Sequence, residues 1–305
     1  MKLRHLRGNT YAVENSSAGT GFSDSASSGV YVFDDRRCLL IDSGPDQARA
    51  QQMLALLEVS GWLVYAIFNT HAHADHCGGN HFIQTVTGCR IYASAIEAAF
   101  INNPLLSPYA MYSAAPPQLL TGKFLMPGAS RVTRIVEPGK IRIKRKPFAI
   151  LDLAGHSLGQ LGIITPDGVL FAGDSLIPRE ILRAHPFLYL ADPGQQLNTL
   201  ELLKKTPYRQ LYLSHGGRTD DLTATLNANR ELLDTIINNV SEIIAEPRSP
   251  EAIIREIIIR HRLPVNRNHY FRLSSSIAGV LSYLCNRRQA RFWVEGNRLL
   301  YQARI

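Results

Sequence analysis

Six consecutive residues, His71-Ala72-His73-Ala74-Asp75-His76, constrain this chain most, because they place three imidazoles and a carboxylate side by side. The apolar run 62–68 before them predicts a buried strand, and Gly78 and Gly79 after them can open a helix. A strand-to-helix turn holds such side chains rigidly and leaves their ring nitrogens free for a metal. Such a string arises by chance in roughly one chain in two thousand, so a metal site is favoured over a histidine-rich loop.

Three more metal-capable side chains follow predicted strands in the same way. Each stands after a short apolar run and near a glycine or another small residue: His156, Asp174 and His215. Taken singly, they have ordinary interpretations as a capping histidine, a turn aspartate and a buried histidine. Ligands on loops at strand ends can converge on one edge of a sheet, so the repeated setting predicts one shared site.

Residues 3–245 alternate between short apolar runs and helical periodicity, which predicts an α/β fold. Strands are predicted within 3–14, 29–41, 62–68, 89–93, 132–136, 141–143, 148–153, 161–164, 169–172 and 211–213. Helices are predicted at 47–59, 80–87, 96–101, 195–205 and 221–245.

Residues 102–130 interrupt this alternation with five prolines and three aromatic residues, so no regular element is expected there. We favour a lid or a binding wall over a surface insertion. Tyr112 in this segment, and His185 and Tyr189 beyond Asp174, are predicted substrate contacts. For His185 and Tyr189, simple anchoring of the loop is the alternative.

Composition is that of an ordinary globular protein, with 45% hydrophobic and 19% charged residues. No apolar run reaches the roughly 20 residues that cross a bilayer. The start, Met1 to His5, lacks the apolar core of a signal peptide. The four cysteines are widely spaced and give no disulfide framework. We therefore expect a cytoplasmic protein without membrane contact.

The order His71-x-His73-x-Asp75-His76, His156, Asp174, His215 resembles the full ligand order of the metallo-β-lactamase superfamily. The resemblance covers essentially residues 3–245. It implies an αββα sandwich with two metal ions at the edge between its sheets, in a catalytic domain spanning residues 1–246.

Matched position by position, the resemblance also implies how the ligands divide. One metal would take His71, His73 and His156. The other would take Asp75, His76 and His215, with Asp174 bridging the two ions.

The chemistry of these side chains agrees with that division. Imidazole and carboxylate ligands suit Zn²⁺ best, and also Fe or Mn. Two such ions share a water, lower its pKa to near 7 and stabilise a developing oxyanion. We expect a metal-bridging hydroxide as the nucleophile, with Asp75 and Asp174 as the catalytic carboxylates. Asp75 would orient the hydroxide or accept its proton.

Differences between this chain and particular branches of the superfamily reduce the number of functions to be expected. The commonest antibiotic-hydrolysing members carry a cysteine where this chain has Asp174, so a β-lactamase is not expected. Sulfur dioxygenases of the superfamily use one iron and fewer ligands. The segment Gly173 to Leu176 and the pair Asp192-Pro193 resemble a glyoxalase-II-like branch of cytoplasmic hydrolases with thioesterase-like and endoribonuclease-like members.

Residues 247–305 predict a separate, small winged-helix-like domain. Helices at 250–262 and 274–286 precede a hairpin of strands 290–294 and 298–302. Residues 248–305 hold 11 arginines, no lysine and three acidic residues, so they carry the whole net charge of +8. Many arginines alternate with apolar residues, which favours a packing or homodimer surface, with binding of an acidic substrate as a further role, over nucleic-acid contact.

We therefore expect a dinuclear hydrolase of a small acyl substrate: a thioester, a lactone or an activated ester. Glutathione itself is not expected in the substrate, because the classical glutathione-thioester enzymes carry a different C-terminal domain. A phosphodiesterase or endoribonuclease of the same fold is the first alternative. A nucleic-acid-binding regulator with a structural metal centre is the second, and the intact ligand set weighs against it.

Overall fold

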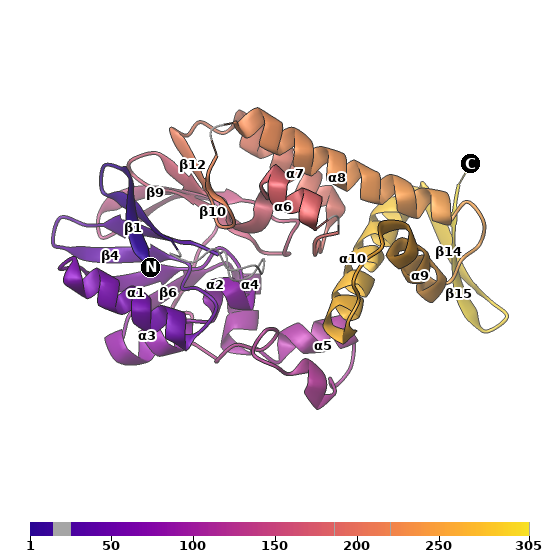
Figure 1. The fold of residues 1–305 in the computed structure, drawn as a ribbon, viewed down its shortest axis with the longest axis horizontal. Helices are drawn as coiled ribbons and strands as arrows, with labels where there is room; N and C mark the ends of the chain where they lie inside the picture. Colours follow the sequence, from indigo (N-terminus) through magenta and orange to yellow (C-terminus); the bar gives the residue numbers. More distant parts are fainter. Residues whose placement is uncertain (15–25, 186, 220, 305) are drawn as a thin grey trace.

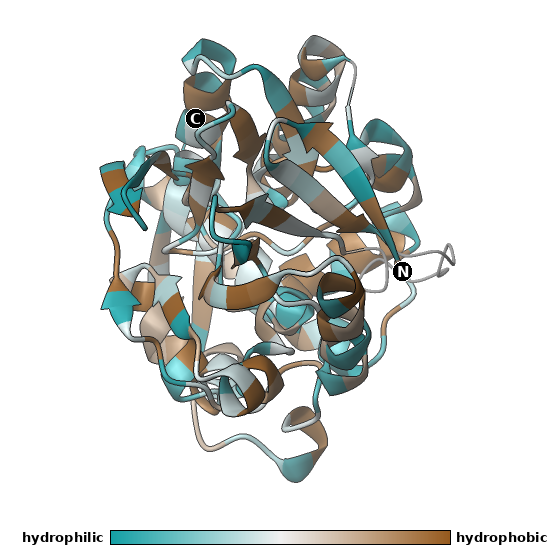
Figure 2. Ribbon diagram, turned by 90° about the vertical axis from the view of Figure 1, so that its left-hand side faces the viewer, coloured by the Kyte–Doolittle hydropathy of each residue, from teal (hydrophilic) through white to brown (hydrophobic). Residues whose placement is uncertain are grey.

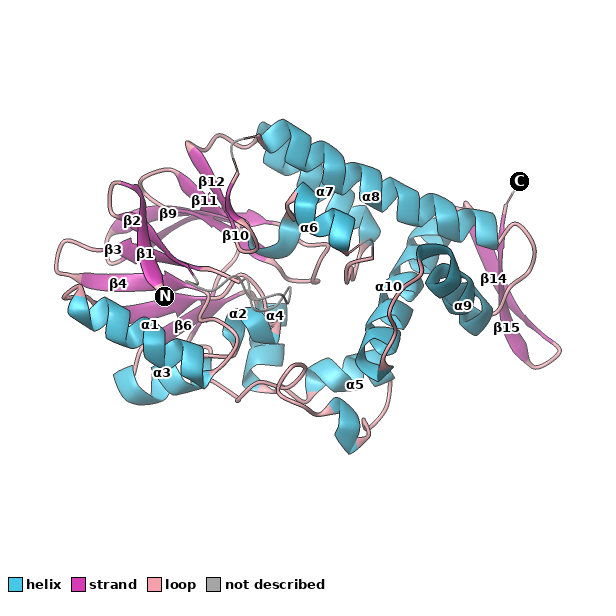
Figure 3. Ribbon diagram, viewed as in Figure 1, coloured by secondary structure: helices cyan, strands magenta, loops and turns pink. Residues whose placement is uncertain are grey.

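Two β-sheets face each other at the centre of the fold (Figures 1 and 3). The structure, a computed structural model, describes residues 1–14, 26–185, 187–219 and 221–304. The first sheet has the strand order β1 (Lys2–Arg7), β2 (Thr10–Glu14), β3 (Ser28–Val32), β4 (Arg37–Ile41), β5 (Leu63–Phe68), β6 (Arg90–Ala93) and β7 (Arg134–Ile135). Strands β1 to β4 pair antiparallel, and β4 to β7 pair parallel.

The second sheet has the order β13 (Gly217–Arg218), β12 (Gln210–Leu213), β11 (Val169–Phe171), β10 (Leu161–Ile164), β9 (Lys146–Asp152) and β8 (Gly139–Ile143). All neighbours in it pair antiparallel except β11 and β12, which are parallel.

The helices of residues 1–246, here called the catalytic part, flank the two sheets, except that α5 lies beside helix α10 (Arg267–Asn286) of the C-terminal residues (Figure 3). They are α1 (Gln47–Val59), α2 (Ala74–Cys77), α3 (Asn80–Thr87), α4 (Ala95–Asn102), α5 (Leu106–Tyr112), α6 (Arg179–Ala184), α7 (Pro193–Lys205) and α8 (Leu222–Ile243). Short 3-10 turns occur at η2 (Gln118–Leu120) and η3 (Gly173–Ser175).

Hydrophobic side chains fill three layers, which explains the sandwich. Between the sheets, the ring of Tyr31 from the first sheet packs edge-on against Phe148 of the second, with centroids 5.1 Å apart. Helices α1 and α3 bury Met53 and Ile83 against the outer face of the first sheet. Helices α7 and α8 cover the second sheet with leucines such as Leu203. Figure 2 shows the hydrophobic residues, in brown, on the strands at the centre of that view and on the helices around them. The predicted αββα sandwich is confirmed.

The segment 102–130 differs from its prediction, because it contains helix α5 and the 3-10 turn η2. Pro108 lies in the first turn of α5, where backbone N–H groups have no helical acceptor and proline is tolerated. Tyr112, at the end of α5, packs edge-on against Phe271 with centroids 5.4 Å apart. The segment therefore contacts the C-terminal part of the chain.

The C-terminal part consists of α9 (Pro250–His261), α10 (Arg267–Asn286) and the hairpin of β14 (Ala290–Glu295) and β15 (Arg298–Ala303). Helix α10 begins at Arg267, not at Ser274, because Asn266 caps it by accepting a hydrogen bond from the His269 N–H. The long helix α8 runs from the catalytic part to this one and shares its core through Val240 (Figure 1). The winged-helix-like domain and its boundary at 246/247 stay predictions.

Within the described residues, the longest helices carry too many polar side chains to span a lipid bilayer.

Truncating the inter-sheet core should destabilise the fold strongly. Phe148→Ala removes a ring that is 2% exposed, and we expect the free energy of unfolding to fall by about 3–5 kcal/mol. Phe292→Ala on β14 is the matched control, because that ring is 60% exposed and should change stability by less than about 0.5 kcal/mol. Chemical denaturation measures both. Equal effects would contradict the assignment of the core between the sheets.

Candidate metal centre

The seven predicted ligands come from four strand ends that meet at one edge of the sandwich. The motif at 71–76 follows β5 and continues into α2, whose first helical residue is Ala74. His156 follows β9, Asp174 lies in η3 directly after β11, and His215 follows β12. The side chains of His71, His76, Asp174 and His215 are almost completely buried.

The side chains form two adjacent clusters, and within each cluster the ligand atoms lie within 4.8 Å of one another. The first holds His71, His73 and His156. The second holds Asp75, His76, Asp174 and His215.

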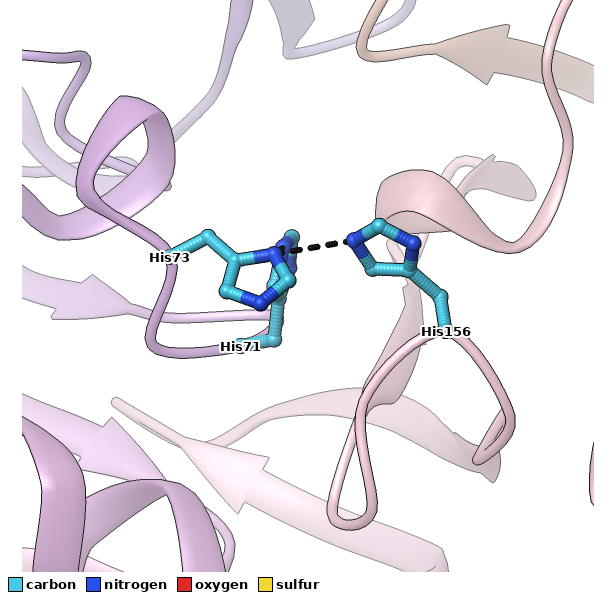
Figure 4. Close-up of side chains that lie close together, drawn as sticks. All are labelled: His71, His73 and His156. Carbon is cyan, nitrogen blue, oxygen red and sulfur yellow. Dashed lines mark hydrogen bonds between the residues drawn. The ribbon is translucent and has the colours of Figure 1, made fainter. Parts of the chain in front are cut away.

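In the first cluster, three ring nitrogens converge on one point (Figure 4). Nδ1 of His73 lies 3.1 Å from Nε2 of His71 and 2.9 Å from Nε2 of His156. Burial lowers the pKa of His73 and of His156 to about 3, and that of His71 well below its usual range. The rings are therefore neutral. Nδ1 of His73 carries at most one proton, so it can donate a hydrogen bond to only one of the two nitrogens that face it. A cation would bind all three lone pairs at once.

In the second cluster, Asp174 faces both groups. Its Oδ1 lies 3.2 Å from Nε2 of His76 and 3.4 Å from Nε2 of His215, while Oδ2 lies 3.5 Å from Nε2 of His156. Oδ2 of Asp75 lies 3.7 Å from the same nitrogen of His215. Oδ2 of Asp174 therefore faces the first cluster, and Oδ1 faces the other ligands of the second.

The charges in this cluster are those of a cation site. Burial opposes ionisation of Asp174, but the neighbouring charges of His215 and His76 hold its pKa well below the usual range. Nε2 of His76 and Oδ1 of Asp174 form a buried ion pair 3.2 Å apart, but they are poorly aligned for a hydrogen bond. Buried charged groups of this kind are usually paired or coordinate metal ions. The side chains present therefore fit a pair of divalent metal ions.

Asp42 orients the second cluster from behind. Its Oδ2 accepts hydrogen bonds from Nδ1 of His76 and the hydroxyl of Thr70, each at 2.8 Å, and its Oδ1 accepts from the Thr70 N–H at 2.8 Å. A histidine held this way presents its other nitrogen to a metal. The sequence analysis missed Asp42. Asp42 directly follows a predicted strand and precedes Ser43-Gly44, which is the same setting as that of the predicted ligands and could have identified it.

Glu97 is a second buried carboxylate that the sequence analysis missed. It accepts hydrogen bonds from the Ala72 N–H at 2.8 Å, the Ser157 hydroxyl at 2.8 Å and the Gly159 N–H at 2.9 Å. It thus joins the motif loop to the His156 loop. Ser94 and Glu97 match a capping box, and Ser94 does cap α4. That pattern predicts a local role for Glu97, so it hides the long-range one.

A cavity of about 240 Å³ opens beside the two clusters. His73, Asp75, His156 and Asp174 line it on one side. The other walls come from α4, α5, the segment after α5, the loop between α6 and α7, and α10. They include Phe100, Met111, Phe124, Leu125, Tyr189 and Arg272.

The three predicted substrate contacts are placed differently. Tyr189 lines this cavity, and its ring packs edge-on against His73 with centroids 5.2 Å apart. The carbonyl oxygen of Tyr189 lies 3.1 Å from Nδ1 of His156 and can accept its N–H. Tyr112 and His185 are not among the residues that line this cavity. Tyr112 packs on α10 instead, and His185 is exposed at the end of α6.

Comparisons with known sequences agree with this geometry. Residues 23–231 match the family described as the metallo-beta-lactamase superfamily. The chain is 28% identical to the hydroxyacylglutathione hydrolase of Rhodospirillum rubrum over 59% of either chain, less than two thirds of that relative's length. It is 29% identical to the hydroxyacylglutathione hydrolase of Hyphomonas neptunium, over 72% of this chain and 75% of the relative.

Solved structures show the same fold. A beta-lactamase domain protein from Burkholderia ambifaria matches 99% of this chain and 93% of its own, with a TM-score of 0.76 and 15% identity. A metallo-beta-lactamase family protein from Thermus thermophilus matches 97% and 99%, with a TM-score of 0.70 and 17% identity. A class B3 di-zinc metallo-beta-lactamase from an Alaskan soil metagenome matches 78% and 92%, with a TM-score of 0.55 and 16% identity.

Removing the charge behind His76 should weaken metal binding. We expect Asp42→Asn to lower metal affinity about 10- to 100-fold, because the neutral amide no longer fixes and polarises the ring. Asp234→Asn is the control and should leave affinity unchanged, since Asp234 is half-exposed on α8 and pairs with Arg230. Competition with a chromophoric chelator measures both. Wild-type affinity in Asp42→Asn would show that Asp42 plays no part in the centre.

Proposed function

Because this chain belongs to the metallo-β-lactamase superfamily, as its ligand order predicts, we propose that it is a dinuclear metal-dependent hydrolase of a small acyl substrate. The substrate is a thioester, a lactone or an activated ester. The observation that carries the proposal is Asp174, whose two carboxylate oxygens face the two clusters separately. A site for one ion would not need a carboxylate in that position.

The ligand assignment follows the two clusters. His71, His73 and His156 would hold one ion, and Asp75, His76 and His215 the other, with Asp174 shared by both. The donors are imidazoles and carboxylates, so Zn²⁺ is the expected ion, and Fe or Mn is compatible with the same set.

When bound, two such metal ions supply a water nucleophile at neutral pH and stabilise the negative charge that develops on a carbonyl oxygen. The residues of the chain position the reactants. Asp75 lines the cavity, where a carboxylate oxygen can orient the attacking water and accept its proton. In thioester hydrolysis the C–S bond breaks, a C–O bond forms, and the proton passes to the leaving thiolate.

The cavity supports a small substrate. Helices α4, α5 and α10 enclose it, and its walls away from the metal side combine apolar side chains with Arg272 and the polar residues Glu97, Ser107, Ser157 and Ser275. Apolar walls suit an acyl chain next to a polar reacting group. The names of the related hydrolases denote cleavage of a hydroxyacylglutathione, which is a thioester. These relatives favour the thioester among the three substrate classes.

Phosphodiester cleavage is the second candidate. The excess of positive charge in residues 248–305 favours it, and Arg255 and Arg267 are exposed at the surface. Other arginines have protein partners, since Arg260 pairs with Glu242 and Glu256. Homodimer formation and the cytoplasmic location stay predictions.

One experiment separates the two candidates. The metal-loaded protein is incubated with end-labelled single-stranded RNA and, in parallel, with an acyl thioester of N-acetylcysteamine, each with and without chelator. We expect chelator-sensitive release of thiol and intact RNA. Metal-dependent RNA cleavage without thioester hydrolysis would replace the acyl hydrolase by a nuclease.

Asp174→Ala should reduce the metal content below two ions per chain. It should also lower the rate of hydrolysis more than about 100-fold, because loss of a residue that only hydrogen-bonds to a ligand already costs up to about 100-fold. Elemental analysis and a thiol-release assay measure the two effects. Asp234→Ala is the control and should match the wild type. Two ions retained in Asp174→Ala would overturn the bridging assignment.

A further inference from the structure

Arg272 places a positive charge in the cavity wall opposite the two clusters of candidate metal ligands. It lies on α10, in the C-terminal part of the chain. The guanidinium lies over the ring of Phe124, 5.3 Å from its centroid, and 6.0 Å from that of Tyr189. The aromatic rings come from two different segments of the catalytic part, so they hold the guanidinium in place at the cavity.

In the part of the chain that the structure describes, no side chain or carbonyl forms a hydrogen bond or an ion pair with this guanidinium. A partly buried arginine is expected to be paired. The ring faces of Phe124 and Tyr189 replace only part of what water supplies. The edge of the guanidinium, with its N–H donors, is therefore available to a ligand.

The nearby charges point to an anion. Asp75 and Asp174 act on Arg272 from a distance and counteract the effect of burial on its pKa. Both carboxylates are in the ligand set, so two divalent ions would more than neutralise them. With two divalent ions bound, the net charge of the metals and these two carboxylates would be positive, so an anionic ligand at Arg272 would be stabilised by that charge as well as by the guanidinium.

The rest of the wall limits what that anion is attached to. Phe100, Met111 and Leu125 give an apolar surface in the same cavity. A ligand that matches both features has a short hydrocarbon chain between its reacting carbonyl and its charged end.

We propose that Arg272 determines substrate specificity by binding a carboxylate at the far end of the acyl group, so that the substrate is a monothioester of a short dicarboxylic acid. This inference rests on the proposed acyl hydrolase and adds the class of acyl group. The planar guanidinium binds a carboxylate through two parallel N–H···O bonds, which also fixes the direction of the chain.

The test compares two acyl groups of the same shape. The S-glutaryl thioester of N-acetylcysteamine carries a terminal carboxylate, and the S-(5-methylhexanoyl) thioester carries an isopropyl group in its place. The metal-loaded protein is assayed with both as wild type, Arg272→Gln, Arg272→Lys and Arg267→Gln. Arg267 is exposed at the start of the same helix, so it serves as the matched control.

We expect the wild type and Arg267→Gln to prefer the glutaryl thioester in kcat/KM. In Arg272→Gln, kcat/KM for that substrate should fall about 10- to 100-fold, as expected for one charge-assisted contact, through a higher KM. The neutral thioester should change less than about threefold. Arg272→Lys should keep part of the preference for the glutaryl thioester, since lysine retains the positive charge but cannot donate two parallel N–H bonds to the carboxylate.

A purely structural role for Arg272, anchoring α10 through the two rings, gives a different result. Both substrates would then lose activity together, and the melting temperature or metal content of Arg272→Gln would fall. That outcome would overturn the proposal, and so would a wild type that shows no preference for the glutaryl thioester.

Calorimetric binding of the two product acids, glutarate and 5-methylhexanoate, keeps this inference separate from the proposed function. If neither thioester is hydrolysed but glutarate binds more tightly and loses that advantage in Arg272→Gln, the acyl hydrolase fails and the carboxylate site stands. If both thioesters are hydrolysed and the two acids bind equally, the hydrolase stands and the role of Arg272 fails. Loss of RNA cleavage in Arg272→Gln, without an effect on either acid, would assign the arginine to a phosphate instead.

Discussion

The fold gathers imidazoles and carboxylates into one buried place, where they are unfavourable without compensating charge. Nε2 of His76 and Oδ1 of Asp174 show this most clearly, since they form a buried ion pair 3.2 Å apart without a well-aligned hydrogen bond. Folding such groups out of water costs free energy that binding of cations can return. The two sheets and their helices provide the rigid edge on which that arrangement is held.

That edge is held by buried side chains outside the ligand set. Asp42 fixes His76 from behind, and Glu97 joins the loop of Ala72 to the loop of Ser157 and Gly159. Gln160 adds a similar contact by accepting the Asp174 N–H at 3.3 Å. Loops from distant parts of the chain are therefore cross-linked by buried hydrogen bonds, which keep the ligand atoms in place before any ion binds.

The catalytic part alone does not complete the cavity. Helix α5 and the residues after it form one wall and α10 forms another, and the contact of Tyr112 with Phe271 joins them. The C-terminal part thus lines the cavity as well as packing on α8. Two solved structures share this full-length architecture, whereas the class B3 enzyme matches a smaller share of the chain.

Local sequence patterns were enough to predict an α/β fold, most of its elements and the order of the ligands, and the resemblance carried by that order implied the αββα sandwich. Strand ends followed by His156, Asp174 and His215 could be recognised one at a time, and hydrophobic periodicity marked the strands and helices around them. It did not reveal α5, because five prolines hid a helix in which Pro108 occupies a tolerated position.

The packing of the elements sets which residues lie behind the ligands and on the opposite wall of the cavity. Asp42, Glu97 and Arg272 resemble an ordinary turn, cap and surface residue when viewed in sequence. Their roles come from partners far along the chain, through hydrogen bonds to other loops or through a wall shared by α10 and the catalytic part. Such contacts are set by how the elements pack, and no short stretch of sequence encodes them.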